Sequence, residues 1–163
     1  MKAFVVDTNV AVVANRQAGQ AGPDCVLVCV AALAGIKDNG KIVLDSGMFI
    51  LDEYLDNLGL AGKPGVGQAF VKWVFDNQAV AQRCERVPIT PMDGSFREFP
   101  DTPELADFHS DDRKYVAVAL TSRNRPKVLN AVDSDWWTYR QVLRQQGVRV
   151  RNLCPRQFSA AAP

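Results

Sequence analysis

The sequence predicts an α/β fold built on a mainly parallel sheet. Short apolar runs typical of strands alternate with longer stretches of helical spacing, and glycines and prolines separate the two kinds of segment. Three of the strand-like runs end in an aspartate, as expected where buried parallel strands lead into turns. The length of 163 residues suits one domain. We place this domain over residues 1–155 and expect residues 156–163 to form a disordered tail.

The first half of the chain predicts two strands, each followed by helices. Pro23 and Asp24 favour a helix start, because proline suits the first helical turn and an acid faces the positive end of the helix dipole. Gly40 and Gly59 favour helix ends. The elements expected are a strand at Lys2–Val6, a helix at Val10–Arg16, a helix at Cys25–Lys37, a strand at Lys41–Asp45, a helix at Ser46–Leu58 and a helix through Phe70 and Asn77.

The second half begins with a long irregular stretch. Pro88–Ser110 is rich in prolines and acids, and such a loop in a compact domain is typical of a functional or mobile segment. Ser110 can cap the helix that follows it. The elements expected next are a helix beginning at Asp111, a strand at Lys127–Val132, a helix at Asp135–Gln146 and an edge strand at Val148–Leu153.

Two segments of the first half bear on function. In the helix at 46–58, Met48, Leu51, Leu55 and Leu58 recur at helical spacing and predict the buried stripe. Glu53 lies about 200° around the helix from Leu51, so it can point into a cleft or into water. The glycine-rich loop Gly59–Gly67 contains GKPGVG, which lacks the Gly-Lys-Ser/Thr ending of a phosphate-binding loop. We expect a connector there, with substrate contact as the alternative.

Composition excludes several classes of protein. With 47% hydrophobic and 23% charged residues, the chain can form a core and is not a disordered or fibrous protein. The longest apolar run, at 26–35, is about half of the roughly 20 residues that a membrane crossing needs. An acid at position 7 interrupts the N-terminus before a signal peptide could develop. We therefore expect a cytoplasmic protein with no membrane partner.

The four cysteines show no Cys-x-x-Cys spacing. They are Cys25, Cys29, Cys84 and Cys154, and a chain of this size folds without disulfide bonds. We expect reduced thiols. A zinc site is disfavoured, because Cys25 and Cys29 lie in an apolar helix and the single histidine, His109, has no partner histidine.

The near-neutral net charge of +1 hides an asymmetry. Residues 1–112 contain 9 Lys and Arg against 16 Asp and Glu, a net charge of −7, whereas residues 113–156 contain 10 against 2, a net charge of +8. This pattern suits a protein that gathers acids at one site and presents bases to a polyanion. The alternative is that the two segments neutralise each other across the fold.

Acids gather where the predicted sheet would bind a ligand. Asp7, Asp45 and Asp133 follow strand-like runs, Asp112 lies at a helix start, and Glu53 can approach from its helix. In an open parallel sheet, ligands bind beyond the carboxyl ends of the strands. Carboxylates brought together raise one another's pKa and destabilise the fold unless a cation compensates them. Because neither His nor Cys accompanies these acids, the expected cation is Mg²⁺ or Mn²⁺.

The order of these residues resembles the PIN domain family of metal-dependent nucleases. The resemblance covers about residues 3–153 and is carried by Asp7-Thr8-Asn9 after the first strand, Glu53 in the middle helix, Asp112 opening DRKYVAVAL, and Asp133 in DSDW. It implies a three-layer α/β/α sandwich and an acidic pocket that binds one or two Mg²⁺ or Mn²⁺ ions. It also implies cleavage of phosphodiester bonds, mostly in RNA.

The resemblance assigns roles residue by residue. The four family acids fall on Asp7, Glu53, Asp112 and Asp133, and Asp112 is preferred to Asp111 because of its interval to the following Ala-Leu. Asp7, Asp112 and Asp133 would bind the metal, and Glu53 would bind it or orient the attacking water. Many relatives have a Thr or Ser two residues before the fourth acid, where this chain has Ala131. That departure predicts weaker metal binding or activity. Asp135 could offset the loss as a further metal ligand. Alternatively, Asp135 is only an exposed acid in the first turn of its helix.

Substrate contacts are expected around the acids. Thr8 or Asn9 could orient a phosphate or the Asp7 carboxylate. Arg113 and Lys114, with some of the other cations, should contact nucleic-acid phosphates. Trp136 and Trp137 could stack on bases but fit a core role better, and His109 is expected to be incidental. The other cations considered are Arg123, Arg125, Lys127, Arg140, Arg144, Arg149 and Arg151.

The function expected is a metal-dependent endoribonuclease, in one version the toxin of a toxin–antitoxin pair with an antitoxin protein as partner. The first alternative is a weakly active or inactive PIN-like module that binds RNA or protein. The second alternative is a phospho-accepting receiver-like domain, which also uses acids at strand ends. A homodimer is expected because the helix at 25–34 is apolar on almost every side, although burial of that helix would explain the same pattern.

Overall fold

A five-stranded parallel sheet forms the centre of the protein, whose structure is a computed structural model describing residues 1–61 and 65–159. The strands lie in the order β3-β2-β1-β6-β7, and all four neighbouring pairs are parallel. Their bounds are β1 Lys2–Val6, β2 Gly40–Asp45, β3 Cys84–Val87, β6 Lys127–Asn130 and β7 Arg149–Asn152. The sheet confirms the predicted α/β class with a mainly parallel sheet.

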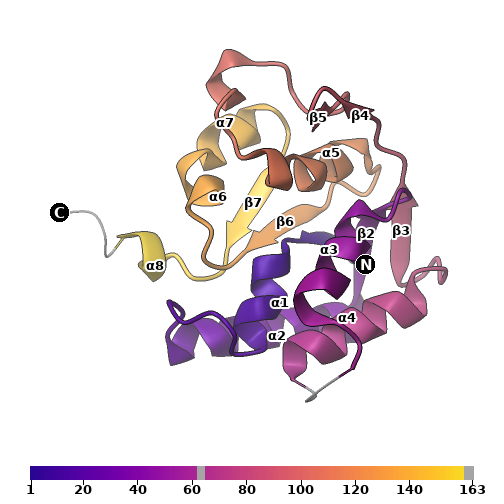
Figure 1. Cartoon of the computed structure of the whole chain (residues 1–163), viewed down its shortest axis with the longest axis vertical. Coiled ribbons are helices and arrows are strands. Elements are labelled where there is room, and N and C mark those ends of the chain that lie inside the picture. The colour runs from indigo at the N-terminus through magenta and orange to yellow at the C-terminus, as the bar shows by residue number, and fades with distance from the viewer. Residues whose placement is uncertain (62–64, 160–163) are drawn as a thin grey trace.

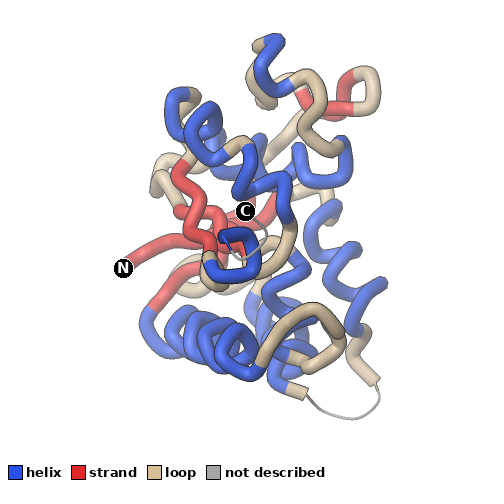
Figure 2. Tube along the Cα trace, turned by 90° about the vertical axis from the view of Figure 1, so that its left-hand side faces the viewer, coloured by secondary structure: helices blue, strands red, loops and turns tan. Residues whose placement is uncertain are grey.

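Helices cover both faces of this sheet and complete a three-layer α/β/α sandwich (Figure 1). One layer contains α1 to α4, which pack on one another, and the other contains α5 to α7. Figure 2 shows the strands between these two groups of helices. The helix bounds are α1 Thr8–Ala14, α2 Pro23–Asn39, α3 Phe49–Leu58, α4 Val66–Asn77, α5 Arg113–Thr121, α6 Ser134–Thr138, α7 Arg140–Gln145 and α8 Arg156–Ser159. Among the described residues, no helix combines the length and apolar character that a bilayer crossing requires.

The predicted elements are present, and the differences have local causes. The helix expected at 135–146 is divided into α6 and α7 at Tyr139, whose ring packs edge-on against Phe108. Strand β3 was not predicted, because Glu85 and Arg86 interrupt its four-residue apolar pattern; it pairs with β2 at one edge of the sheet. Strand β7 is the other edge strand, as predicted.

The segment expected to be irregular, Pro88–Ser110, contains only short elements. The strands β4 (Pro91–Met92) and β5 (Ser95–Phe96) form a small antiparallel hairpin, and η1 (Pro103–Leu105) is a single 3-10 turn. A second 3-10 turn, η2 (Ser110–Asp112), precedes α5, so the helix begins two residues later than predicted.

The stripe predicted for α3 is confirmed at Leu51, whereas Met48, Leu55 and Leu58 are only partly buried. The buried residues of α3 are Ile50, Leu51 and Tyr54. The Tyr54 hydroxyl donates a hydrogen bond to the carbonyl oxygen of Val6 at the end of β1. This anchor leaves the neighbouring residue Glu53 beside the carboxyl end of β1.

The glycines after α3 serve packing between helices. A Cβ atom at Gly67 would overlap the carbonyl oxygen of Ala11, and one at Gly65 would overlap the side chain of Asn15. Glycine at these positions allows α4 to approach α1 closely. Part of the predicted connector, residues 62–64, lies outside the described residues.

The prediction of four reduced thiols is wrong for two of them. Cys25, in the first turn of α2, forms a disulfide with Cys154, which follows β7. The two residues are 129 positions apart, and no local spacing signals a pair that only the folded sheet brings together. Cys29 and Cys84 are free and buried, and burial raises the pKa of Cys29 to about 12.

The C-terminal segment differs from the expected disordered tail at residues 156–159. These residues form α8, and the Phe158 ring stacks on Trp137 at a centroid distance of 5.3 Å. Residues 160–163 of the expected tail lie outside the described part of the chain.

Candidate metal centre

An acidic pocket of about 430 Å³ opens at the carboxyl ends of β1 and β6. After β1 the chain builds β2 and β3 on one side of it, then crosses to build β6 and β7 on the other side. The point between β1 and β6 is therefore where the strand order reverses, and ligands of open α/β sheets bind in the crevice at such a point. The pocket is lined by Asp7, Thr8, Asn9, Val12, Ala18, Gln20, Glu53, Asn57, His109, Asp111, Asp112, Val132, Asp133 and Asp135.

Asp7 is held at the end of β1 by two donors. It is the N-cap of α1: its Oδ1 accepts a hydrogen bond from the Asn9 backbone N–H at 2.9 Å. Its Oδ2 accepts one from the Trp136 indole N–H at 2.7 Å. Asp7 is only 5% exposed, so these two bonds fix the carboxylate within the fold.

Asp112 and Asp133 complete a group of three carboxylates, which we call the aspartate triad. Asp112 ends η2 and is buried, and Asp133 is the half-buried N-cap of α6, with Oδ1 accepting from the Asp135 N–H at 2.9 Å. One carboxylate oxygen from each of Asp7, Asp112 and Asp133 lies within 4.8 Å of the other two. The sheet and two helix starts thus gather residues that are up to 126 positions apart in the sequence.

The triad is electrostatically unfavourable without a cation. The pKa of Asp112 is raised from 3.8 to about 9, first because the carboxyl is buried and then because Asp7 and Asp133 are negative. Burial also raises the pKa of Asp7 to about 6, although the hydrogen bonds from Asn9 and Trp136 oppose the rise. A divalent cation among the carboxylates would remove this repulsion.

The donor set fits Mg²⁺ or Mn²⁺. All three groups of the triad offer carboxylate oxygens, which hard divalent cations prefer, and neither Cys nor the imidazole of a histidine belongs to the set. The Asp7 and Asp133 oxygens that accept hydrogen bonds each keep a second lone pair. The pocket therefore has the ligands and the negative charge for such an ion.

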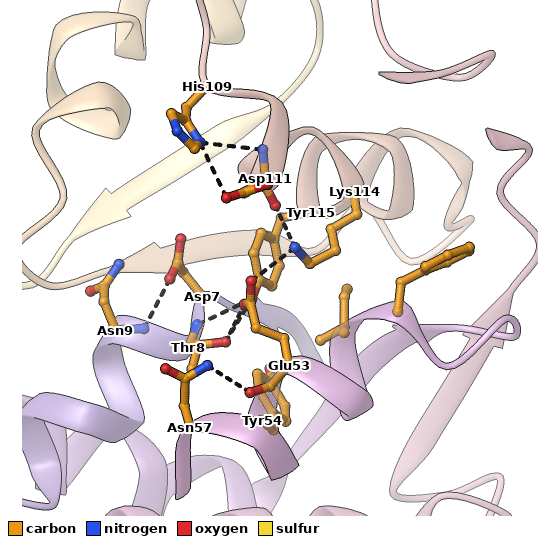
Figure 3. A network of polar contacts seen from close by, with 12 residues as sticks. Asp7, Thr8, Asn9, Glu53, Tyr54, Asn57, His109, Asp111, Lys114 and Tyr115 are labelled. Carbon is orange, nitrogen blue, oxygen red and sulfur yellow. Dashed lines mark hydrogen bonds and ion pairs between the residues drawn. The ribbon is translucent and has the colours of Figure 1, made fainter. Parts of the chain in front are cut away.

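Glu53 lines the same pocket as the triad but is engaged by three other side chains, which Figure 3 shows together with Asp7. Its Oε1 accepts from the Lys114 ammonium group at 2.9 Å, and its Oε2 accepts from the hydroxyl groups of Thr8 and Tyr115. These hydroxyls also contact each other at 2.7 Å. Among the described residues, the carboxylates that could share one ion are the triad alone, so the structure does not group Glu53 with them.

Asn9 connects the two strands at the switch point. Its side-chain amide donates to Asn130 Oδ1 at 2.9 Å, and its own Oδ1 accepts from the backbone N–H groups of Ala131 and Val132. Asn9 thus fastens the start of α1 to the end of β6, and its backbone orients Asp7. Ala131 is fully buried in this junction.

Arg113 and Lys114, the two cations assigned to substrate binding, are both engaged by other groups of the protein. Arg113 stacks over the Phe99 ring at 4.6 Å and donates to the carbonyl oxygens of Phe108 and Ala106, so it braces the 88–110 segment. It does not line the acidic pocket. Lys114 is buried in its ion pair with Glu53.

Two further acids line the pocket but do not belong to the triad. Asp135 lies outside the triad, and its Oδ2 accepts from the His109 backbone N–H at 3.0 Å. Asp111 is exposed, which agrees with the preference for Asp112, and its backbone N–H donates to the His109 ring.

Two functional contacts were missed by sequence reasoning. Trp136 is fully buried, as its predicted core role requires, but it also orients Asp7. Tyr115 orients Glu53. The spacing of Trp136 three residues after Asp133 gave no sign of a bond to a residue 129 positions away.

A second surface gathers five cations of the C-terminal segment. Across the start of β6, most of β7 and the surface of α7 runs a groove of about 480 Å³, which we call the basic groove. In the described part of the chain, none of its five cations takes part in an ion pair. It is lined by Lys127, Arg140, Gln141, Arg144, Arg149, Val150 and Arg151.

No family model, curated protein or solved structure matches the chain in comparisons with known proteins. The class that the fold and the site define is an open parallel α/β protein with a carboxylate pocket at its switch point. The receiver-like alternative requires the strand order 2-1-3-4-5. Counted within the parallel sheet, the order here is 3-2-1-4-5, so that alternative is excluded.

Proposed function

We propose that this protein is a metal-dependent nuclease that hydrolyses RNA phosphodiester bonds with Mg²⁺ or Mn²⁺ held by the aspartate triad. The observation that carries the proposal is the convergence of Asp7, Asp112 and Asp133 in an open pocket at the switch point. The resemblance of the same acids to those of PIN domain nucleases supports it. RNA, rather than DNA, is the substrate class that this resemblance favours.

The chemistry follows from the charge of the site. A bound divalent ion supplies charge neutralisation for the phosphate and lowers the pKa of a water molecule. The protein's part is to hold the ligands in place before the substrate arrives, through the bonds from Trp136 and Asn9 to Asp7 and the cap position of Asp133. No side-chain nucleophile is required.

The basic groove offers a place for the rest of the RNA strand. Its Lys127 lies at the opposite end of β6 from Asp133, roughly 13 Å away along four residues of parallel strand, and its Arg151 pairs with Leu129 closer to the pocket end. Arg140 and Arg149 donate to the backbone carbonyls of Trp137 and Arg125, but none of the cations has an acidic partner among the described residues, so their charge is available to phosphates. An antitoxin partner stays a prediction. A homodimer also stays a prediction, and α2 would form its interface, since the apolar side chain of Leu27 on this helix is 64% exposed.

The test is cleavage of labelled RNA, single-stranded DNA and flap substrates by purified protein with Mg²⁺ or Mn²⁺. We expect RNA cleavage that a chelator stops and that Asp7→Asn or Asp112→Asn lowers about 100-fold or more, since each removes a charge that holds the ion. Asp52→Asn is the matched control, because Asp52 is an exposed acid on α3 next to Glu53, and it should keep activity within about threefold.

Two results would contradict the proposal in different ways. Cleavage that survives Asp7→Asn would show that the activity does not come from this pocket. Binding of Mn²⁺ and RNA without any cleavage would instead favour the RNA-binding module, for which the engaged Glu53 and the buried Ala131 are the observations.

A further inference from the structure

Lys114 is a buried cation that contacts two residues lining the acidic pocket, Glu53 and Asp111. Its ammonium group lies 2.9 Å from Glu53 Oε1, and the two side chains are 11% and 27% exposed. The same group also donates a hydrogen bond to the backbone carbonyl of Asp111, next to Asp112. Lys114 therefore connects the start of α5, which carries one triad member, to α3 on the other side of the pocket (Figure 3).

The remaining contacts of Glu53 keep it on Lys114. Its second oxygen accepts from the Thr8 and Tyr115 hydroxyls, and Tyr115 is fully buried. With both oxygens engaged and one positive charge at contact distance, Glu53 is neutralised by the protein itself. The triad has no such partner among the described ion pairs.

We infer that the Lys114 ammonium group takes the place that a second divalent ion would occupy beside Glu53, so that the pocket binds a single divalent ion on Asp7, Asp112 and Asp133. This inference rests on the proposed metal site. It assigns Lys114 and Glu53 as a pair that sets the number of ions: Lys114 repels a second ion, and Glu53 positions the Lys114 ammonium group and is not a ligand of the ion on the triad. An ion on the triad leaves this pair intact, because none of the triad carboxylates is bonded to it.

The inference is tested by calorimetric titration of the full chain with Mn²⁺ alone, without RNA. We expect one ion per wild-type chain. Lys114→Met removes the charge and keeps the length of the side chain, so it should free Glu53 and raise the number to two. Lys72→Met is the matched control, since Lys72 forms an exposed ion pair with Asp76 on α4, and it should still bind one ion.

A double variant makes the test independent of the stability of the single one. Lys114→Met/Glu53→Gln removes both charges of the pair and leaves no unpaired buried ion. If Glu53 is not a ligand, this variant binds one Mn²⁺ with a Kd within about threefold of wild type. If Glu53 is a ligand, the Kd should weaken by more than about tenfold, since a metal ligand has been lost.

The outcomes separate the inference from the proposed function. Two ions on the wild-type chain, a single ion on folded Lys114→Met, or the tenfold loss in the double variant would each overturn the inference while leaving a metal site. No Mn²⁺ binding by the wild-type chain would overturn the proposed metal centre itself, and the inference with it. Circular dichroism of each variant establishes that it is folded.

Discussion

At the scale of single residues, Asp112 links the charge of the pocket to the stability of the fold. Its carboxyl is buried beside two other acids, and its pKa is raised to about 9. Between pH 4 and 9 the folded, metal-free protein therefore keeps a proton that the unfolded chain has released. The free energy of unfolding is therefore highest below the pKa that Asp112 has in the unfolded chain. It declines with rising pH until the pH passes the pKa of Asp112 in the folded protein.

We expect the free energy of unfolding of the metal-free protein to fall as the pH increases from about 4 to 9. The slope should not exceed about 1.4 kcal/mol per pH unit for each proton involved. Asp112→Asn should flatten the slope, because it removes the titrating group, and added Mn²⁺ should oppose the loss at high pH. Urea titrations at several pH values measure this effect, with Asp52→Asn as the control. An unchanged slope in Asp112→Asn would mean that Asp112 is already ionised in the folded protein.

The sequence predicted the acids of the site but not the residues that orient them. The acids were predictable, because each follows a strand or opens a helix, and these positions meet at one edge of a parallel sheet. Their hydrogen-bond partners were not. Trp136, Tyr115 and Asn130 contribute through contacts between segments more than 100 positions apart, and local pattern carries no information on such contacts.

At the scale of elements, a disulfide joins the first turn of α2 to the segment after β7. It closes a loop across 129 positions and so restricts the unfolded chain strongly. We expect reduction to lower the free energy of unfolding by about 2–4 kcal/mol. Denaturant titrations with and without reductant measure the difference.

The control for this experiment is Cys25→Ala/Cys154→Ala. This variant should be as stable as the reduced wild type and should not respond to reductant. Because Cys29 and Cys84 are buried and free, they offer no alternative source for a response. A wild-type protein whose stability is the same in both conditions would show that the bond contributes nothing to the fold.

Other elements show why sequence reading located segments better than boundaries. The strands β1 and β2 were predicted within a residue, since each is an apolar run ended by an acid. The buried stripe of α3 was predicted to include Leu55 and Leu58, but Tyr54 is buried instead. Its ring packs in the core while its hydroxyl donates a hydrogen bond to a backbone carbonyl, and apolar spacing does not reveal such a residue. Strand β3 was missed because an edge strand tolerates charged residues.

At the scale of the whole molecule, the charge asymmetry becomes a separation in space. Four acids of the first part line the pocket together with the two acids of the last part, Asp133 and Asp135, whereas five cations of the last part line the basic groove. The alternative that the two segments only neutralise each other does not describe the groove, whose cations have no partners among the described acids.

We expect Arg144→Gln/Arg151→Gln to weaken RNA binding about tenfold at moderate salt. Loss of two phosphate contacts should also reduce the slope of log K against log salt concentration by about 1.4, at 0.7 per cation for a single strand. Fluorescence anisotropy at several salt concentrations, with Asp7→Asn as background to prevent cleavage, measures both quantities. Lys72→Gln/Arg83→Gln, on the side of α4 and β3, is the control and should change neither. Equal slopes for the two double variants would remove the basic groove from the RNA path.

The order in which the strands join the sheet has a consequence for synthesis of the protein. Strand β1 is central, but its neighbour β6 comes last but one in the parallel sheet, and Asp133 follows it. A growing chain that has not yet emerged from the ribosome as far as position 133 carries Asp7 without Asp133, and so without the complete triad. Translation must thus pass position 133 before the pocket exists, and a nascent chain that stops short of β6 and α6 has no assembled triad.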